Sequence, residues 1–349
     1  MKNFLGISAK IALGLVLALA LLELLLRVLP TCNLPLTTSK STQYVSKPIL
    51  PNQDVLYSRG WMFQIGNKVE INSAGFHSGT EYARRQDGSA VAFVGDSMIE
   101  NIMVDSGHLL HPVLERKFKN SGADVSVYSF GNSGSGMGDI VNFMRMASEK
   151  YNVKNFVIKF DRNGILDDLR HYDGHFCYVE NASGGAGIKL FPKNTAYEKL
   201  KNVAIVRYIF SNIQLTPGSF LEKLKAALGI KKDNPKLSPD KSPSRLSKDE
   251  NILLDAFIGD VLKIVGNNPK RVLFLLRGAD AKELLTAKFK SAGFETLDVD
   301  AVTKSESEAS LSHFHNDLHW NATGIGRICS AIEKTKFFHE IAKLAPKAK

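Results

Sequence analysis

The stretch VAFVGDSMIE, residues 91–100, decides the fold, because an apolar run ends there on a Gly-Asp-Ser turn and helix-forming residues follow. A short, wholly apolar run bounded by a turn predicts a buried strand of a parallel sheet. Ligands of such sheets collect at the carboxyl ends of the strands. Ser97 is therefore either a helix N-cap or a nucleophile, and the rest of the chain must distinguish the two.

The same alternation of strand and helix recurs along the chain. Apolar runs predict five strands, at 91–94, 125–130, 156–160, 272–276 and 296–299. Amphipathic stretches such as HLLHPVLERKFK, DIVNFMRMASEKY and AKELLTAKFKSAG separate them and predict helices. Together they predict an α/β protein, a three-layer α/β/α sandwich with a five-stranded, mostly parallel sheet.

Composition sets the size of the core and argues against several classes of protein. With 349 residues, 44% of them hydrophobic, the chain can bury a full core in one main domain with appendages. The net charge of +10 is spread over short Lys/Arg groups, without the aromatic-interleaved stripe of single-strand binders, so nucleic acid is not expected as a partner. Solvated lysines are the favoured explanation, and anionic lipid or an acidic glycan is the alternative.

The three cysteines are Cys32, Cys177 and Cys329. Their spacing matches neither a zinc site nor a disulfide framework, and it leaves room for one disulfide at most.

The amino terminus predicts where the protein is located. Residues 11–29 are almost wholly apolar, follow two lysines, and are long enough to cross a bilayer as a helix. The apolar run continues through LLELLLRVLP, where a cleaved signal peptide would have ended, so an uncleaved anchor is favoured over a signal peptide or a lipoprotein. Glu23 and Arg27 can pair on one helical face. By the positive-inside rule the residues after the helix face the periplasm or the cell exterior.

Three regions are predicted along the chain. Residues 1–30 form the anchor, residues 31–69 form a juxtamembrane linker and the start of a hairpin around WMFQIGNKVEINSAGF, and residues 70–349 form the main domain. The connection at 171–267 is too long for a simple loop. We expect it to hold two helices, KNVAIVRYIFSNI and SFLEKLKAALGI, that cap the site, and then a flexible loop.

Two segments that follow strands carry possible hydrogen-bond donors. The segment SFGNSGSGMGD lacks both the G-x-G-x-x-G pattern and the Walker lysine, so a backbone N–H aimed at a reaction centre, that of Gly131, is favoured over a phosphate or cofactor loop. After the third strand, the side-chain amide of Asn163 can donate to an oxyanion. The alternative is that Asn163 is a turn asparagine only.

The carboxyl-terminal segment HFHNDLHWNATGIGRI supplies a base and an acid. A serine esterase needs a base to take the serine proton and a carboxylate to orient that base, and His319 and Asp317 provide both. Asn321 or Thr323 can cap a final helix. A metal site is the alternative, because four possible ligands alternate along the segment: His313, His315, Asp317 and His319. It is disfavoured, since the segment has no cysteine partner or H-E-x-x-H helix and a metal leaves Ser97 unexplained.

In this order the four segments resemble the blocks of the SGNH hydrolase superfamily, also called GDSL-like esterases. GDS resembles the first block, FGNSG the glycine block, DRNG the asparagine block and DLHWNATG the final Asp/His block, over most of residues 70–335 outside the insertion. The resemblance implies a flavodoxin-like sandwich and a catalytic triad of Ser97, His319 and Asp317. It also implies an oxyanion hole formed by Ser97, Gly131 and Asn163, and no metal or organic cofactor.

The chain departs from that pattern at three positions. Ser129 stands where many relatives have asparagine, and Gly164 stands where many have aspartate. Asp317 lies two residues before His319 rather than three, as in SGNH-like proteins that acetylate or deacetylate exopolysaccharides.

The anchor and the INSAGF segment are also similar to membrane-anchored bacterial members of the superfamily. The resemblance thus implies a single-pass esterase of the bacterial inner membrane that removes acyl groups, acetyl above all, from a small ester or an acylated surface glycan. Two alternatives stay open: a carbohydrate O-acyltransferase with the same triad, and a non-catalytic binding module in surface-polymer assembly.

Overall fold

A computed structural model describes the chain except at residues 1, 34, 39, 172–173, 182–183, 192–201, 216–245, 280, 305–311, 315–318 and 349. The chain forms two compact units. The first comprises residues 1–34, 55–68 and 195–237, and the second comprises residues 35–54, 69–194 and 238–349. The segment predicted as a linker is thus divided between the two units.

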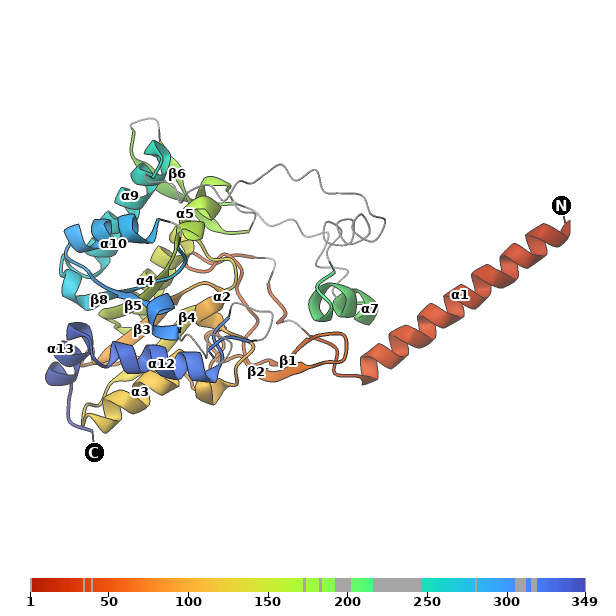
Figure 1. Ribbon diagram of the computed structural model, residues 1–349, viewed down its shortest axis with the longest axis horizontal. Helices are drawn as coiled ribbons and strands as arrows, with labels where there is room; N and C mark the ends of the chain where they lie inside the picture. Colours follow the sequence, from red (N-terminus) through yellow and green to blue (C-terminus); the bar gives the residue numbers. More distant parts are fainter. Residues whose placement is uncertain are drawn as a thin grey trace. The chain divides into compact units, whose positions relative to one another are not determined.

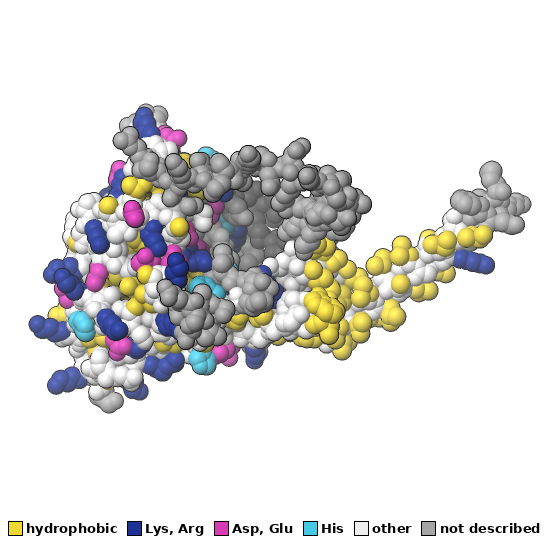
Figure 2. Space-filling model, viewed as in Figure 1, with side chains coloured by type: hydrophobic (Ala, Val, Ile, Leu, Met, Phe, Trp, Pro, Cys, Tyr) yellow, Lys and Arg dark blue, Asp and Glu magenta, His cyan; other side chains and the backbone are white. Residues whose placement is uncertain are grey.

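The first unit contains the helix predicted as an anchor. Its elements are α1 (Lys2–Val28), β1 (Asp54–Arg59), β2 (Ile65–Glu70), α7 (Ala204–Arg207) and the π-helical turn η2 (Tyr208–Asn212). From Ile7 to Val28, α1 is long and apolar enough to cross a membrane, a criterion that a signal sequence also meets. Figure 2 shows its exposed apolar side chains. The predicted Glu23–Arg27 ion pair is confirmed, at 2.8 Å.

The second unit is built on the five predicted strands. They are β3 (Ala90–Gly95), β4 (Ser126–Gly131), β5 (Asn155–Phe160), β8 (Val272–Leu276) and β9 (Glu295–Asp298). Their order in the sheet is β4-β3-β5-β8-β9, and every neighbouring pair is parallel. The chain therefore reverses its direction of winding beside β3, and a switch point of this kind opens a crevice at the carboxyl ends of the strands.

Helices cover both faces of the sheet (Figure 1). One face packs on α3 (Leu110–Asn120), α12 (Ala322–Ile332) and α13 (Lys336–Leu344), and the other on α4 (Met137–Tyr151), α9 (Lys248–Ile264) and α10 (Lys282–Ser291). Alternate residues of each strand enter opposite cores: Val91 and Phe93 face α3 and α12, while Ala92 and Val94 face α4. The predicted three-layer sandwich is confirmed.

Shorter elements complete the second unit. They are α2 (Ser97–Glu100), η1 (Ser106–His108), α5 (Arg162–Leu169), β6 (Phe176–Glu180), β7 (Ala186–Leu190), η3 (Pro269–Arg271) and α11 (Val299–Thr303).

The hairpin and the long connection differ in detail from the prediction. The two-stranded sheet β1-β2 begins earlier than the predicted hairpin, and INSAGF lies beyond it. The connection at 171–267 contains the antiparallel hairpin β6–β7 and then α9, which the sequence analysis assigned in part to a flexible loop. That helix begins with a capping box formed by Ser247 and Glu250, and it buries Leu253, Phe257 and Val261 in the core.

Of the two helices predicted inside this connection, the first is reduced to α7 and η2. The second, at 219–230, and the loop at 231–245 lie outside the described residues.

Candidate active site

Ser97 is the first residue of α2, directly after β3. A Cβ on Gly95 would lie 2.7 Å from the Ile99 side chain, so glycine lets the short helix pack closely on the strand end. Asp96, not Ser97, is the N-cap, because its Oδ1 accepts a hydrogen bond from the Met98 N–H at 3.0 Å. The hydroxyl of Ser97 is thus not used as a cap and is half-buried at the carboxyl end of β3.

His319 meets Ser97 although 222 positions separate them in the sequence. Its Nε2 lies 2.9 Å from the Ser97 Oγ. In the tautomer with the ring proton on Nδ1, the serine hydroxyl donates this hydrogen bond. A nucleophile and a base within hydrogen-bond reach are the arrangement required for transfer of the serine proton.

The backbone on either side of His319 is anchored. Trp320 is fully buried, and its carbonyl accepts a hydrogen bond from the Asn101 side chain at 2.8 Å. The N–H of Phe314 donates to the His319 carbonyl at 3.2 Å. Asn321 caps α12 by accepting from the Gly324 N–H at 2.9 Å, which confirms one of the two predicted caps. Hydrogen bonds therefore hold the backbone carbonyls of His319 and Trp320 in place at the start of α12.

The two other predicted donors lie at the carboxyl ends of the strands beside β3. Gly131 ends β4 in register with Gly95, and Asn163 lies exposed in the first turn of α5, directly after β5. A Cβ on Gly131 would lie 2.3 Å from the Glu100 nitrogen, so the close packing of β4 on α2 already requires glycine there. An oxyanion role for the N–H of Gly131 and for the Asn163 amide stays a prediction.

The acid of the predicted triad, Asp317, lies outside the described residues, as does His315. Two of the four possible ligands in the metal alternative are therefore not described. Among the residues that are described, no group of three His, Cys, Asp or Glu side chains could hold a metal ion. The three cysteines are buried, and no disulfide joins them: Cys32, Cys177 and Cys329.

A buried lysine beside Ser97 was missed in the sequence analysis. Lys159, in the mostly apolar strand β5, is only 3% exposed and donates to Asp96 and to Asp161, both at 2.6 Å. Burial alone would raise the pKa of Asp96, but the charge and hydrogen bond of Lys159 hold it below its ordinary value. Burial likewise opposes the charge on Lys159, yet the two carboxylates keep its pKa above the ordinary value. The only sequence signal was one charged residue inside a strand.

A second buried carboxyl, Glu100, lies at the end of α2. It accepts hydrogen bonds from both the backbone and the hydroxyl of Ser133 in the glycine segment. Burial raises the pKa of Glu100, and the Ser133 bonds and the charge of His319 act in the opposite direction. The charge of His319 also lowers the pKa of Asp96.

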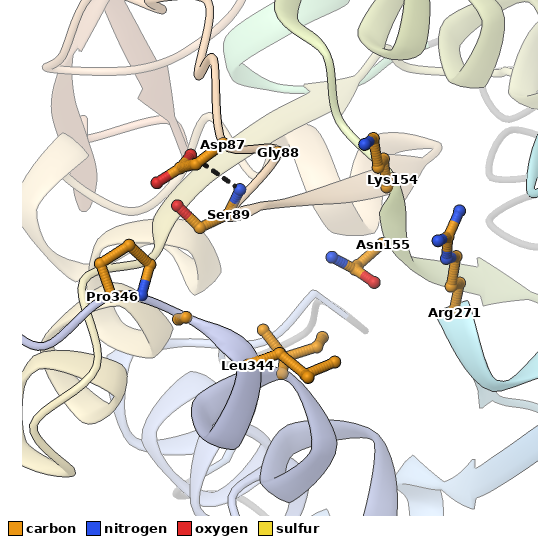
Figure 3. Close-up of a pocket in the computed structure, with 10 residues that line it drawn as sticks. Asp87, Gly88, Ser89, Lys154, Asn155, Arg271, Leu344 and Pro346 are labelled. Carbon is orange, nitrogen blue, oxygen red and sulfur yellow. Dashed lines mark hydrogen bonds between the residues drawn. The ribbon is translucent and has the colours of Figure 1, made fainter.

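A cavity of about 300 Å³ lies at the other end of the sheet (Figure 3). Its lining includes Ser89, Asn155 and Arg271, which stand at the amino ends of β3, β5 and β8. This cavity is therefore not the site of Ser97 and His319, which lies at the carboxyl ends of the strands.

No protein-family model and no curated protein matches the chain. Among solved structures, a lipase/acylhydrolase from Enterococcus faecalis is similar over 74% of this chain and 98% of its own, with a TM-score of 0.36 and 12% identity. An acetyl xylan esterase, Est2A, from the rumen bacterium Butyrivibrio proteoclasticus is similar over 76% of this chain and 64% of its own, with a TM-score of 0.30 and 10% identity. Function is therefore argued from the residues at the site.

Proposed function

We propose that the protein is a membrane-anchored serine esterase of the SGNH type that hydrolyses acetyl esters of a cell-surface carbohydrate. The observation that supports it most directly is the 2.9 Å hydrogen bond between the Ser97 hydroxyl and the His319 Nε2. A hydroxyl at the carboxyl end of a parallel strand, not used as a cap and bonded to an imidazole, has the geometry of an activated nucleophile.

In this mechanism the Ser97 oxygen attacks the ester carbonyl while its proton passes to the His319 Nε2. The tetrahedral intermediate collapses, the bond to the alcohol breaks, and the imidazolium protonates the departing alkoxide. The acyl group is left on Ser97. Water then attacks this acyl-serine with His319 as the base, which releases the carboxylic acid and restores the serine hydroxyl.

Two sets of groups stabilise the charges that develop. The backbone N–H groups of Ser97 and Gly131 and the side-chain amide of Asn163 receive the oxyanion, where loss of one donor costs about a hundredfold or more in rate. Asp317 orients His319 and stabilises its imidazolium, as the resemblance to SGNH hydrolases implies. No metal or organic cofactor takes part in these steps.

The location and substrate follow from the sequence features at the two ends of the chain. With α1 as an uncleaved anchor in a bacterial inner membrane, the second unit acts in the periplasm or outside the cell. The D-x-H spacing of Asp317 and His319 supports an acylated surface carbohydrate as the substrate.

The decisive experiment uses the full chain in detergent with a fluorophosphonate probe and p-nitrophenyl acetate. We expect the wild type to be labelled and to turn over the ester, and Ser97→Ala to lose both. Ser121→Ala, at an exposed serine that ends α3, is the matched control and should behave as the wild type does. A wild-type chain that is neither labelled nor active would contradict the esterase and favour a non-catalytic binding module.

Acetylated glycans separate hydrolysis from transfer. Release of free acetate in water supports the esterase, whereas acetyl transfer to an added sugar hydroxyl that outcompetes water would establish the O-acyltransferase alternative. Loss of turnover on addition of a chelator would favour the metal alternative.

A further inference from the structure

Three charged side chains join the carboxyl ends of β3 and β5. Lys159 donates one hydrogen bond to the Asp96 Oδ2 and another to the Asp161 Oδ2, each at 2.6 Å. Asp96 is the N-cap of α2, and its other oxygen accepts from the Met98 N–H at 3.0 Å. Asp161 is the N-cap of α5, and its other oxygen accepts from the Gly164 N–H at 3.3 Å. One ammonium group thus holds both caps.

These two caps stand next to two residues of the proposed site. Ser97 follows Asp96 in the chain, and Asn163 lies two residues after Asp161. The strands that carry the caps are neighbours in the sheet, with Val94 in register with Ile158. The position of the nucleophile relative to the amide donor therefore depends on the same ammonium group.

We propose that Lys159 is a positioning residue that fixes the helix carrying Ser97 against the turn carrying Asn163, so that both act on one ester group. The inference rests on the proposed function, because only an ester substrate gives these two side chains a common target. Lys159 itself does not touch the substrate; it acts through Asp96 and Asp161.

The burial of the three groups explains why a cation is needed. Lys159 is 3% exposed, and the side chains of Asp96 and Asp161 are 24% and 13% exposed. Two carboxylates so close together and shielded from water repel each other unless a positive charge lies between them. Without Lys159, one carboxyl would have to take up a proton, or the two caps would have to move apart.

Other charged groups face this cluster. The charge of His319 lowers the pKa of Asp96. The charge of Asp96 raises the pKa of Glu100. The charges of Asp161 and Asp96 both raise the pKa of Asp167. Of these, only His319 is a base in the proposed mechanism. Titration of the carboxyl pair in a variant without Lys159 would affect the alkaline side of the pH profile of labelling.

The test compares three variants of the full chain in detergent. Lys159→Met removes the cation. Lys159→Met/Asp161→Asn also removes one carboxylate, and asparagine is as good an N-cap as aspartate. Lys282→Met is the matched control, because Lys282 likewise bridges two carboxylates, Asp298 and Asp300, at the edge strand β9.

We expect Lys159→Met to lower the fluorophosphonate labelling rate about a hundredfold, the loss typical of a misplacement of about 1 Å. Its labelling rate should fall as the pH rises, because ionisation of the second carboxylate restores the repulsion. The double variant should be labelled at least tenfold faster than Lys159→Met, and its labelling rate should not fall at alkaline pH. Lys282→Met should stay within twofold of the wild type.

Hydrogen exchange provides a readout that does not depend on activity. In Lys159→Met, the amides of Met98 and Gly164 should exchange faster together, and in Lys282→Met neither should change. If Lys159→Met does not fold, the double variant is compared with Asp161→Asn alone, and slower labelling with faster exchange at Met98 supports the proposal.

Three results would overturn the proposal. They are labelling of Lys159→Met at the wild-type rate, faster exchange in only one of the two segments, and a loss of labelling that neither depends on pH nor recovers in the double variant. If the wild type is not labelled at all, the proposed esterase fails, and with it the catalytic part of this inference. The exchange data then still decide whether Lys159 couples the two caps.

Discussion

The Asn101 side chain donates a hydrogen bond to the carbonyl of Trp320, 2.8 Å away, and so joins the end of α2 to the residue that follows His319. Asn101 is the C-cap of α2 and is buried, with left-handed backbone angles of φ 39° and ψ 58°. Ser97 begins the same short helix. The serine and the histidine are thus held together by a second bond, four residues from one and one residue from the other.

Replacement of Asn101 should therefore slow the reaction without removing a catalytic group. Glycine keeps the left-handed backbone at no steric cost and removes only the side chain. We expect Asn101→Gly to lower the fluorophosphonate labelling rate about ten- to a hundredfold, because Ser97 and His319 lose their fixed separation. Labelling is measured as a second-order rate at pH 7.5.

Asn152→Gly is the matched control for that variant. Asn152 is the left-handed C-cap of α4, and its side chain donates to the Arg85 carbonyl at 2.6 Å. Both variants should lose about 1 kcal/mol of stability for the hydrogen bond. Equal labelling rates in the two variants would show that Asn101 has a structural role only.

Replacement of His319 should slow the reaction more than replacement of Asn101. We expect His319→Gln to reduce turnover of p-nitrophenyl acetate by about 10³- to 10⁴-fold, because Ser97 then has no acceptor for its proton. Asp317→Asn should cause a loss of about the same order by failing to stabilise the imidazolium. The exposed His108, which pairs with Asp105, supplies the control His108→Gln. Wild-type turnover in His319→Gln would rule out the proposed mechanism.

The sheet and its carboxyl edge could be predicted because they depend on local patterns. Buried parallel strands are continuous apolar runs, and all five were found within two residues of their bounds. The Gly-Asp-Ser turn marked the end of β3 and the position of Ser97. The start of α9 was also marked, by Ser247 and Glu250 with the capping-box spacing, but the polar residues around them were taken for a loop.

The roles of Lys159 and Asn101 could not be predicted in the same way, because each depends on a partner that is distant in sequence. Asp96 is 63 positions from Lys159, and Trp320 is 219 positions from Asn101. A lysine inside a strand normally indicates a solvent-facing position. Only the pairing of β3 with β5 places it between two N-caps.

Acid should destabilise the fold through a buried histidine on α3. His111 bonds to the Ser78 hydroxyl at 3.1 Å, and its Nδ1 has no partner. Burial, and secondarily the charge of His77, lower the pKa of His111 to about 3. In the unfolded chain the pKa of His111 is about 6.5, so between pH 6.5 and pH 3 the unfolded chain binds a proton that the folded chain does not bind. The free energy of unfolding is therefore unaffected by His111 above pH 6.5 and decreases as the pH falls toward 3.

At pH 5 this loss amounts to about 2 kcal/mol. Urea unfolding of the full chain in detergent at pH 7.5 and pH 5 measures it. His111→Gln keeps a partner for Ser78 but does not titrate, so its stability should fall less between the two pH values than that of the wild type. His108→Gln, at an exposed site, should fall as the wild type does. A parallel decline in all three proteins would assign the acid sensitivity to other groups.

The proposed role of α1 as an anchor leads to a prediction that is independent of the esterase site. The 22 residues Ile7–Val28 of α1 should keep the full chain in the membrane pellet through alkaline carbonate extraction, and the mature protein should retain residues 1–20. Leu17→Arg places a charge near the middle of the helix, where it costs about 2.5–3.5 kcal/mol, and should release part of the protein. Lys10→Arg keeps the flanking charge and is the control. If the mass of the mature protein instead corresponds to a chain that begins at residue 21, after the Ala18-Leu-Ala20 sequence, the segment is a cleaved signal peptide and the protein is not held in the bilayer.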